Sequence, residues 1–201
     1  MKLRPVAMKL SESTLSLLKN FSNINQSILF KQGNKLRTIS VMKNILAEAT
    51  IGEEIPKDFG IYDLSQFLNG LGLHHNPELD FANNGHVVIK EGRMRSKYFF
   101  ADPGVIVTPP DKEIEIPSVD VSFELSTNQL DKLLKAAAVY QLPDFCAVGG
   151  AGVVQLVVRD KKNDTSNSFS VIVGETDKEF TFNFKIENIK ILPGTYDVSI
   201  S

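Results

Sequence analysis

The sequence contains the same pattern twice, and this internal repeat limits the folds that the chain can adopt. In residues 10–31 a Leu-Ser pair precedes an amphipathic helical pattern, and an apolar strand pattern follows. Residues 125–148 repeat this order, with an offset of 115 residues between Leu10 and Leu125. Residues 59–81 and 182–200 form a second pair of similar segments. Two copies of one strand–helix–strand unit predict a pseudo-symmetric, two-domain chain.

The composition is that of an ordinary globular protein and excludes several classes. The chain has 201 residues, of which 42% are hydrophobic, and this length suits two domains of common size. No run reaches the roughly 18 apolar residues of a membrane span, so we expect no membrane partner. A single cysteine, Cys146, excludes an internal disulfide and fits a reducing compartment. The net charge of −2 means that any contact with nucleic acid depends on local charge.

Three helices are predicted from capping residues that precede apolar residues at helical spacing. Ser11, Asp63 and Ser126 are the expected N-caps of helices over 12–22, 64–72 and 127–140, and Gln129 completes a capping box. The Asn83-Asn84-Gly85 and Gly149–Gly152 stretches predict hairpin turns. Strands are expected at 27–31, 36–41, 45–51, 58–62, 78–82, 86–91, 94–100, 119–125, 144–148, 153–160, 167–174, 179–185 and 195–201, with one or two helical turns over 186–192.

A proline-rich, acidic stretch separates the two halves. We expect an N-terminal domain over 1–108, an extended connector over 109–118 and a C-terminal domain over 119–201. The Met-Lys-Leu triplet at position 1 recurs at position 8, where it leads directly into the repeat, so we expect Met8 to be the natural start.

The long helices pair an apolar face with a face rich in Asn, Gln, Ser and Lys. On the predicted helix 127–140, for example, Asn128, Lys132 and Lys135 lie opposite the leucines. Two interpretations remain open at this point. The polar faces are either ordinary solvated surface, or they contact a phosphate backbone without reading sequence.

No catalytic pattern is recognisable. The glycines at 149–152 lack the following helix that a phosphate loop needs, and we interpret them as a turn. We interpret His74-His75 as a surface turn, since adjacent side chains point apart, and Cys146 as a core residue. We therefore expect no enzyme activity, no metal and no cofactor.

Short motifs in order along nearly the whole chain resemble the DNA polymerase sliding clamps of T-even-type bacteriophages. These motifs are Met8-Lys9-Leu10-Ser11, Leu17-Leu18-Lys19-Asn20-Phe21, Ile24-Asn25, Ala47-Glu48-Ala49, Ile61-Tyr62-Asp63-Leu64, Phe67-Leu68, Ala101-Asp102-Pro103, Leu133-Leu134, Phe182-Asn183-Phe184 and Pro193-Gly194-Thr195-Tyr196. The resemblance implies an α+β, two-domain fold similar to proliferating cell nuclear antigen. Antiparallel sheets would lie outside, and two helices per domain would line a homotrimeric ring.

The resemblance also implies partners and sites. The ring would encircle duplex DNA without sequence specificity, tether the phage DNA polymerase, and be opened by a clamp-loader complex in the cytoplasm of the infected host cell. The expected DNA-contacting residues are Lys19, Asn20, Asn128, Lys132, Lys135, Lys185 and Lys190. The expected docking residues for a partner peptide are Val41, Met42, Ile45, Ile114, Ile116 and Pro193. The expected subunit interface pairs strand edges that carry Phe169, Val171 and Val173 on one copy and Val105 and Val107 on the next.

Two features differ from the family pattern. The family continues for roughly thirty residues beyond the position of Ser201, so we expect the C-terminal domain to lack its last strands. The residues after Lys135 are alanines, where the family has a further basic residue. The competing hypothesis is a two-domain, β-rich structural or virion protein with no DNA role, in which the repeat reflects duplication alone.

Overall fold

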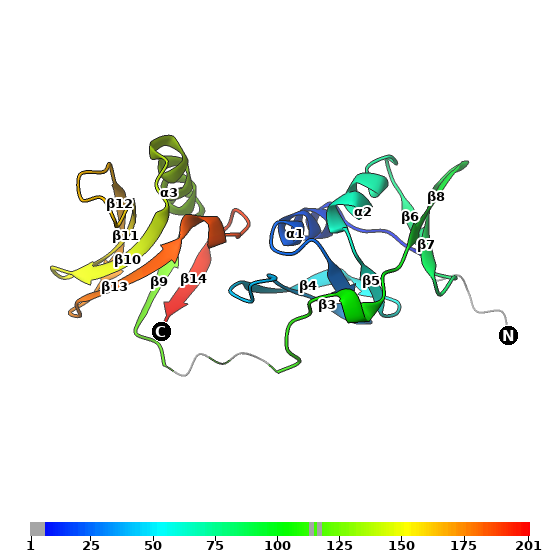
Figure 1. Ribbon diagram of the computed structural model, residues 1–201, viewed down its shortest axis with the longest axis horizontal. Coiled ribbons are helices and arrows are strands. Elements are labelled where there is room, and N and C mark those ends of the chain that lie inside the picture. Colours follow the sequence, from blue (N-terminus) through cyan, green and yellow to red (C-terminus); the bar gives the residue numbers. More distant parts are fainter. Residues whose placement is uncertain (1–6, 113–114, 116–117) are drawn as a thin grey trace. The chain divides into compact units, whose positions relative to one another are not determined.

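The computed structural model describes residues 7–112, 115 and 118–201, and it divides the chain into two compact units on either side of Asp111 (Figure 1). Each unit combines helices with antiparallel strands, which confirms the predicted α+β class. No helix in the described part of the chain is long and apolar enough to cross a membrane. The expected docking residues Ile114 and Ile116 lie outside the described residues, as does most of the segment before Met8.

The described residues of the first unit form two α-helices and eight strands. In chain order these are β1 (Ala7–Met8), α1 (Glu12–Ser22), β2 (Ile28–Phe30), β3 (Gly33–Ile39), β4 (Leu46–Ile55), β5 (Phe59–Ile61), α2 (Leu64–Leu71), β6 (Glu78–Asp80), β7 (His86–Glu91) and β8 (Met94–Phe99). A short 3₁₀ helix, η1 (Pro103–Val105), follows. The order β1-β6-β7-β8 forms one sheet, and β2 pairs with β5 and β3 with β4.

Within its described part, the second unit has one α-helix and six strands. In chain order these are β9 (Val121–Leu125), α3 (Thr127–Tyr140), β10 (Asp144–Gly150), β11 (Val153–Arg159), β12 (Phe169–Glu175), β13 (Phe180–Lys185), the 3₁₀ helix η2 (Ile186–Asn188) and β14 (Tyr196–Ile200). Its main sheet has the order β12-β11-β10-β13, and β14 pairs with β9.

The two units share one topology over their first eight elements, which confirms the repeat predicted from the sequence. The antiparallel pairs β1–β6, β2–β5 and β3–β4 of the first unit correspond to β9–β14, β10–β13 and β11–β12 of the second. In the described residues, β7 and β8 have no counterpart in the second unit.

The predicted capping residues begin all three helices. The Ser11 hydroxyl accepts a hydrogen bond from the Thr14 amide, and the Asp63 carboxylate accepts one from the Gln66 amide at 2.8 Å. Ser126 and Gln129 form the predicted capping box. These local signals fix helix starts because they satisfy amide groups that have no partner within the helix.

Two local features go beyond the sequence pattern. Of the one or two helical turns expected over 186–192, one forms, the 3₁₀ turn η2, so the second helix of this unit is a 3₁₀ helix and not an α-helix. Pro193 and Gly194 follow closely, and Ile189 leaves the helical region with a ψ of 82°, so no second turn forms. The strand β1 was missed because two residues carry no detectable alternation, and only its pairing with β6 defines it.

Each unit has its own hydrophobic core between its helices and its sheets. In the first, Leu18 and Phe21 of α1 pack in one cluster with Leu36 of β3. In the second, Leu133 of α3 is fully buried in a cluster with Leu156 of β11. The apolar faces of the helices are therefore buried in the cores, and their polar faces point away from the sheets.

Candidate nucleic-acid interface and docking surfaces

The position of α1 is fixed by a carboxylate on a neighbouring strand. Glu53 of β4 accepts hydrogen bonds from the Ser11 backbone amide and from the Thr14 hydroxyl, the latter at 2.7 Å. Burial opposes ionisation of Glu53, but these hydrogen bonds outweigh it and hold the pKa of the carboxyl below its usual value. The first turn of α1 is thus tied to the sheet, which orients the polar face that carries Lys19.

A groove of about 750 Å³, lined by both polar and apolar side chains, lies between α1 and α2. Lys19 lines it, together with Ser16 and Asn23 from the α1 side and Ser65 and Asn69 from α2. Lys19 is exposed, and Asn20 beside it is half-buried. Hydroxyl, amide and ammonium groups of this kind can contact phosphate oxygens without any base specificity. The groove also includes His75, which the sequence analysis interpreted only as part of a turn.

The polar face of α3 is less positive than the sequence pattern suggested. Asn128, Lys132 and Lys135 are all exposed, as predicted for this face. The Lys135 ammonium, however, lies 2.8 Å from a carboxylate oxygen of Asp131, one turn earlier on the same helix. The helical spacing of these two residues predicts such a pair. Asp131 places an acid among the lysines of this face, where the sequence analysis considered the lysines alone.

Lys185 has a structural partner. Its ammonium lies 2.9 Å from a carboxylate oxygen of Asp144, which is buried and also accepts a hydrogen bond from the Lys161 amide. Burial would raise the pKa of Asp144, but the Lys185 and Lys161 hydrogen bonds outweigh it, and the net shift is downward. The pair joins the ends of β10 and β13, so the charge of Lys185 is partly balanced within the protein, and its expected DNA contact stays a prediction. Lys190 is half-buried in the segment after η2.

The expected docking residues separate into different environments. Val41 and Met42 lie at the tip of the β3–β4 loop with 67% and 83% of their surfaces exposed, whereas Ile45 packs against the core of the first unit. The Ser40 hydroxyl holds the loop by accepting hydrogen bonds from the amides of Asn44 and Ile45.

Pro193 lies close to the start of α3. It shares a small pocket with Thr127, Leu130 and Leu134 of that helix, because the turn before β14 folds back against the helix start. Its expected role in docking a partner peptide stays a prediction.

The expected interface segments also have different structures. In the described chain β12 pairs only with β11, so its outer edge is open as predicted, although Phe169, Val171 and Val173 pack into the core of their own unit. The alternating side chains Ser170 and Ile172 point outward, and Ile172 is 59% exposed.

The segment around Val105 and Val107, the expected partner in the subunit interface, is not a regular strand, and its role in the interface stays a prediction. Val105 ends the 3₁₀ turn η1, which the Asp102 carboxylate caps by accepting a hydrogen bond from the Gly104 amide at 2.7 Å. The Val107 carbonyl accepts a hydrogen bond from the Asn25 side chain. Pro103 supplies no amide donor, which favours the turn over a strand edge.

Comparison with known proteins gives consistent matches over both units. A family described as DNA polymerase processivity factor matches residues 9–108, and one described as gp45 sliding clamp, C terminal, matches residues 122–201. The sliding clamp of Vibrio phage KVP40 is 34% identical over 199 residues, which cover 96% of this chain and 90% of that protein. The chain belongs to the sliding-clamp family of DNA polymerase processivity factors. The sliding clamp of Enterobacteria phage T4 is also 34% identical, over 94% of this chain and 85% of that protein.

Solved structures of clamps share the fold. Proliferating cellular nuclear antigen from Entamoeba histolytica superimposes with a TM-score of 0.69 at 17% identity, over 97% of this chain and 89% of that one. A DNA polymerase III subunit beta sliding clamp from Bartonella birtlesii superimposes with a TM-score of 0.65 at 13% identity, over 97% and 59%. The protein is a non-catalytic processivity factor of phage DNA replication. The alternative of a structural or virion protein with no DNA role is wrong.

Proposed function

We propose that three copies of this sliding clamp close into a ring that encircles duplex DNA and tethers the phage DNA polymerase. The observation that carries the proposal is the repeated topology of the two units. Two similar units per chain would give a head-to-tail ring of three copies six similar units, and the duplicated strand pairings supply them. The open edge of β12 offers an unpaired strand for the contact, and its partner is the segment around Val105 and Val107 of the next copy.

Within such a ring, the polar faces of the helices contact the phosphate backbone. Lys19, Lys132 and Lys135 supply the positive charge, supported by Asn20 and Asn128, and Lys190 contributes from the segment after η2. A ring is held on DNA by topology, so each contact can be weak, and weak contacts permit sliding. This agrees with a net charge of only −2 and with few basic residues on the helix faces.

The test combines mass and topology. Sedimentation should give a mass near three times 22.3 kDa. After loading by a phage clamp loader, the protein should stay on nicked circular DNA and leave the same DNA once a restriction enzyme linearises it. A monomer under all conditions, or equal retention on circular and linear DNA, would overturn the proposal.

We further propose that the polymerase docks by a short peptide on the loop tip formed by Val41 and Met42, beside Ile45. Two large, exposed apolar side chains on one loop are the supporting observation. The family resemblance also supports this assignment, because it places the loop in the docking site. It places Ile114 and Ile116 in the same site. Met42→Ser should weaken binding of the polymerase C-terminal peptide in a fluorescence titration, whereas Met94→Ser, an exposed methionine on β8, should leave it unchanged.

A further inference from the structure

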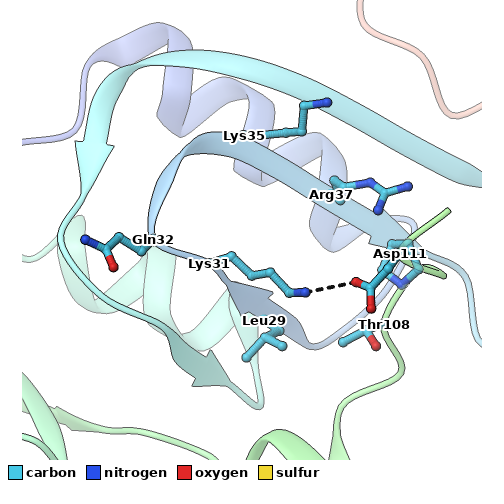
Figure 2. A pocket seen from close by; sticks show the side chains of 8 residues that line it. Leu29, Lys31, Gln32, Lys35, Arg37, Thr108 and Asp111 are labelled. Atoms are coloured by element: carbon cyan, nitrogen blue, oxygen red, sulfur yellow. Dashed lines mark hydrogen bonds and ion pairs between the residues drawn. The ribbon is translucent and has the colours of Figure 1, made fainter. Parts of the chain in front are cut away.

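The first unit has a second candidate surface, a small pocket on the opposite side of β3 from the helices. We call it the basic pocket, and Figure 2 shows its lining residues. They are Leu29, Lys31, Gln32, Lys35, Arg37, Thr108, Pro109 and Asp111. Its volume is about 220 Å³, below the roughly 300–1,000 Å³ of small-molecule sites, so it suits a side chain rather than a free ligand.

The face on which the basic pocket lies follows from the alternation along β3. Leu36 and Thr38 are buried, and Leu36 packs in the same cluster as the α1 residues Leu18 and Phe21. Lys35 and Arg37 alternate with them and therefore point to the other face. This face is turned away from α1, so the basic pocket does not share the surface that we propose for DNA.

The charges in the basic pocket are not balanced. Lys31, Lys35 and Arg37 provide three positive charges, and among the lining residues Asp111 is the one acid. Glu48, on β4, contacts both Lys35 and Arg37 at 2.8 Å. The three basic residues therefore face two carboxylates, those of Asp111 and Glu48, and the five side chains together carry a net charge of +1.

The ion pair between Lys31 and Asp111 is exposed, so a carboxylate from another molecule can replace Asp111. The Lys31 ammonium lies 3.0 Å from the Asp111 carboxylate, and their side chains are 60% and 89% exposed (Figure 2). A pair this exposed contributes little stability, so another carboxylate can displace Asp111 at small cost.

Arg37 lines the same pocket and can donate further hydrogen bonds. Its Nη1 donates to the Pro110 carbonyl at 2.9 Å, and its Nε lies against Glu48. A guanidinium has five N–H donors, and the bonds that the described residues make to it leave donors for a further oxygen.

We propose that the basic pocket receives an acidic side chain from a peptide segment of a partner protein, which takes the place of Asp111 on Lys31 and Arg37. A single carboxylate fits better than a nucleic-acid backbone, because a chain of phosphates would face Glu48 and Asp111 as well. Leu29 and Pro109 add apolar contact for a neighbouring residue of the same peptide. The inference rests on the proposed function only in that the partner belongs to the replication machinery.

The experiment uses two matched probes, N-acetyl-leucyl-glutamic acid amide and its glutamine counterpart. Each is titrated into ¹⁵N-labelled full-length protein and followed by amide NMR. The glutamate probe should shift the resonances of Lys31, Gln32 and Thr108, and it should bind about two- to fivefold more tightly than the glutamine probe, as an exposed ion pair allows. Lys31→Met should remove the difference between the probes, and Asp111→Asn should strengthen glutamate binding. Lys97→Met, which removes the same charge on β8, should change neither.

Equal binding of the two probes, or shifts confined to other residues, would overturn the proposal. A short duplex DNA that displaces the glutamate probe from these residues would also overturn it and would assign the pocket to nucleic acid. The outcome of the probe titration does not depend on ring formation, because retention on circular DNA is measured in a separate experiment. Loss of that retention with an intact probe response would refute the proposed function alone.

Discussion

Replacing Lys19 by methionine should reduce the salt dependence of DNA binding more than replacing Lys135. Lys19 is exposed in the groove between α1 and α2, and in the described part of the chain no carboxylate pairs with it. The Lys135 ammonium lies 2.8 Å from Asp131, so its charge is already partly balanced. Each phosphate that a lysine neutralises contributes about 0.9 to the slope of log affinity against log salt. Lys19→Met should therefore lower the slope by up to about 0.9 per subunit, and Lys135→Met by less.

The same reasoning predicts that Asp131→Asn strengthens DNA binding. An exposed ion pair one helical turn apart is worth about 0.3–0.5 kcal/mol. Releasing Lys135 from this pair should therefore raise the affinity about twofold per subunit, since about 1.4 kcal/mol corresponds to a factor of ten. In the double variant Lys135→Met/Asp131→Asn this gain should largely disappear.

The assay is fluorescence anisotropy of a labelled duplex at salt concentrations between about 50 and 200 mM, where such slopes are measured. Lys97→Met on β8 and Lys162→Met in the β11–β12 loop are matched controls, because each removes one positive charge away from the helix faces. A Lys19→Met slope equal to that of the controls would refute the reasoning, as would weaker binding by Asp131→Asn.

Three further predictions concern stability and assembly. Asp144→Ala should lower the free energy of unfolding of the second unit by about 2–3 kcal/mol in urea titrations, because two donors lose a buried acceptor. Since folding lowers the pKa of Asp144, its contribution is present above the unfolded value of about 3.9 and is lost as the pH falls through the lower folded value; a contribution that grows on acidification would contradict this. Glu53→Ala should speed amide hydrogen exchange in the first turn of α1 and leave α3 unchanged, and uniform acceleration would argue against a local tie. Val171→Pro should shift gel-filtration elution from trimer to monomer, whereas Asp164→Pro, in the preceding loop, should still assemble.

Much of the fold was predictable from the sequence because its signals are local. The caps Ser11, Asp63 and Ser126 start their helices as predicted, since a side-chain oxygen at the N-cap acts on amides within three residues. The turn at 149–152 was predictable for the same reason, and Ala151 and Gly152 adopt the positive φ angles of 51° and 84° that a tight hairpin needs.

The charge environment of the candidate site was predictable only in part. The Asp131–Lys135 ion pair was predictable from the sequence, because an acid and a lysine four residues apart lie side by side on a helix. The pairs Lys185–Asp144 and Lys31–Asp111 join residues 41 and 80 positions apart, and no periodicity in the sequence connects them.

The sequence alone determined that this chain is a duplicated, two-domain clamp, because the strand, helix and turn signals are local and occur twice in the same order. The tertiary structure alone decided which of its charged side chains remain available. Long-range strand pairing brings β10 beside β13, and tertiary folding places residues 107–111 beside the segment after β2. Only then do Lys185 and Lys31 meet their carboxylates. A lysine looks the same in sequence whether its partner is solvent, a buried aspartate or a phosphate, since the Coulomb interaction depends on distance in space and not along the chain.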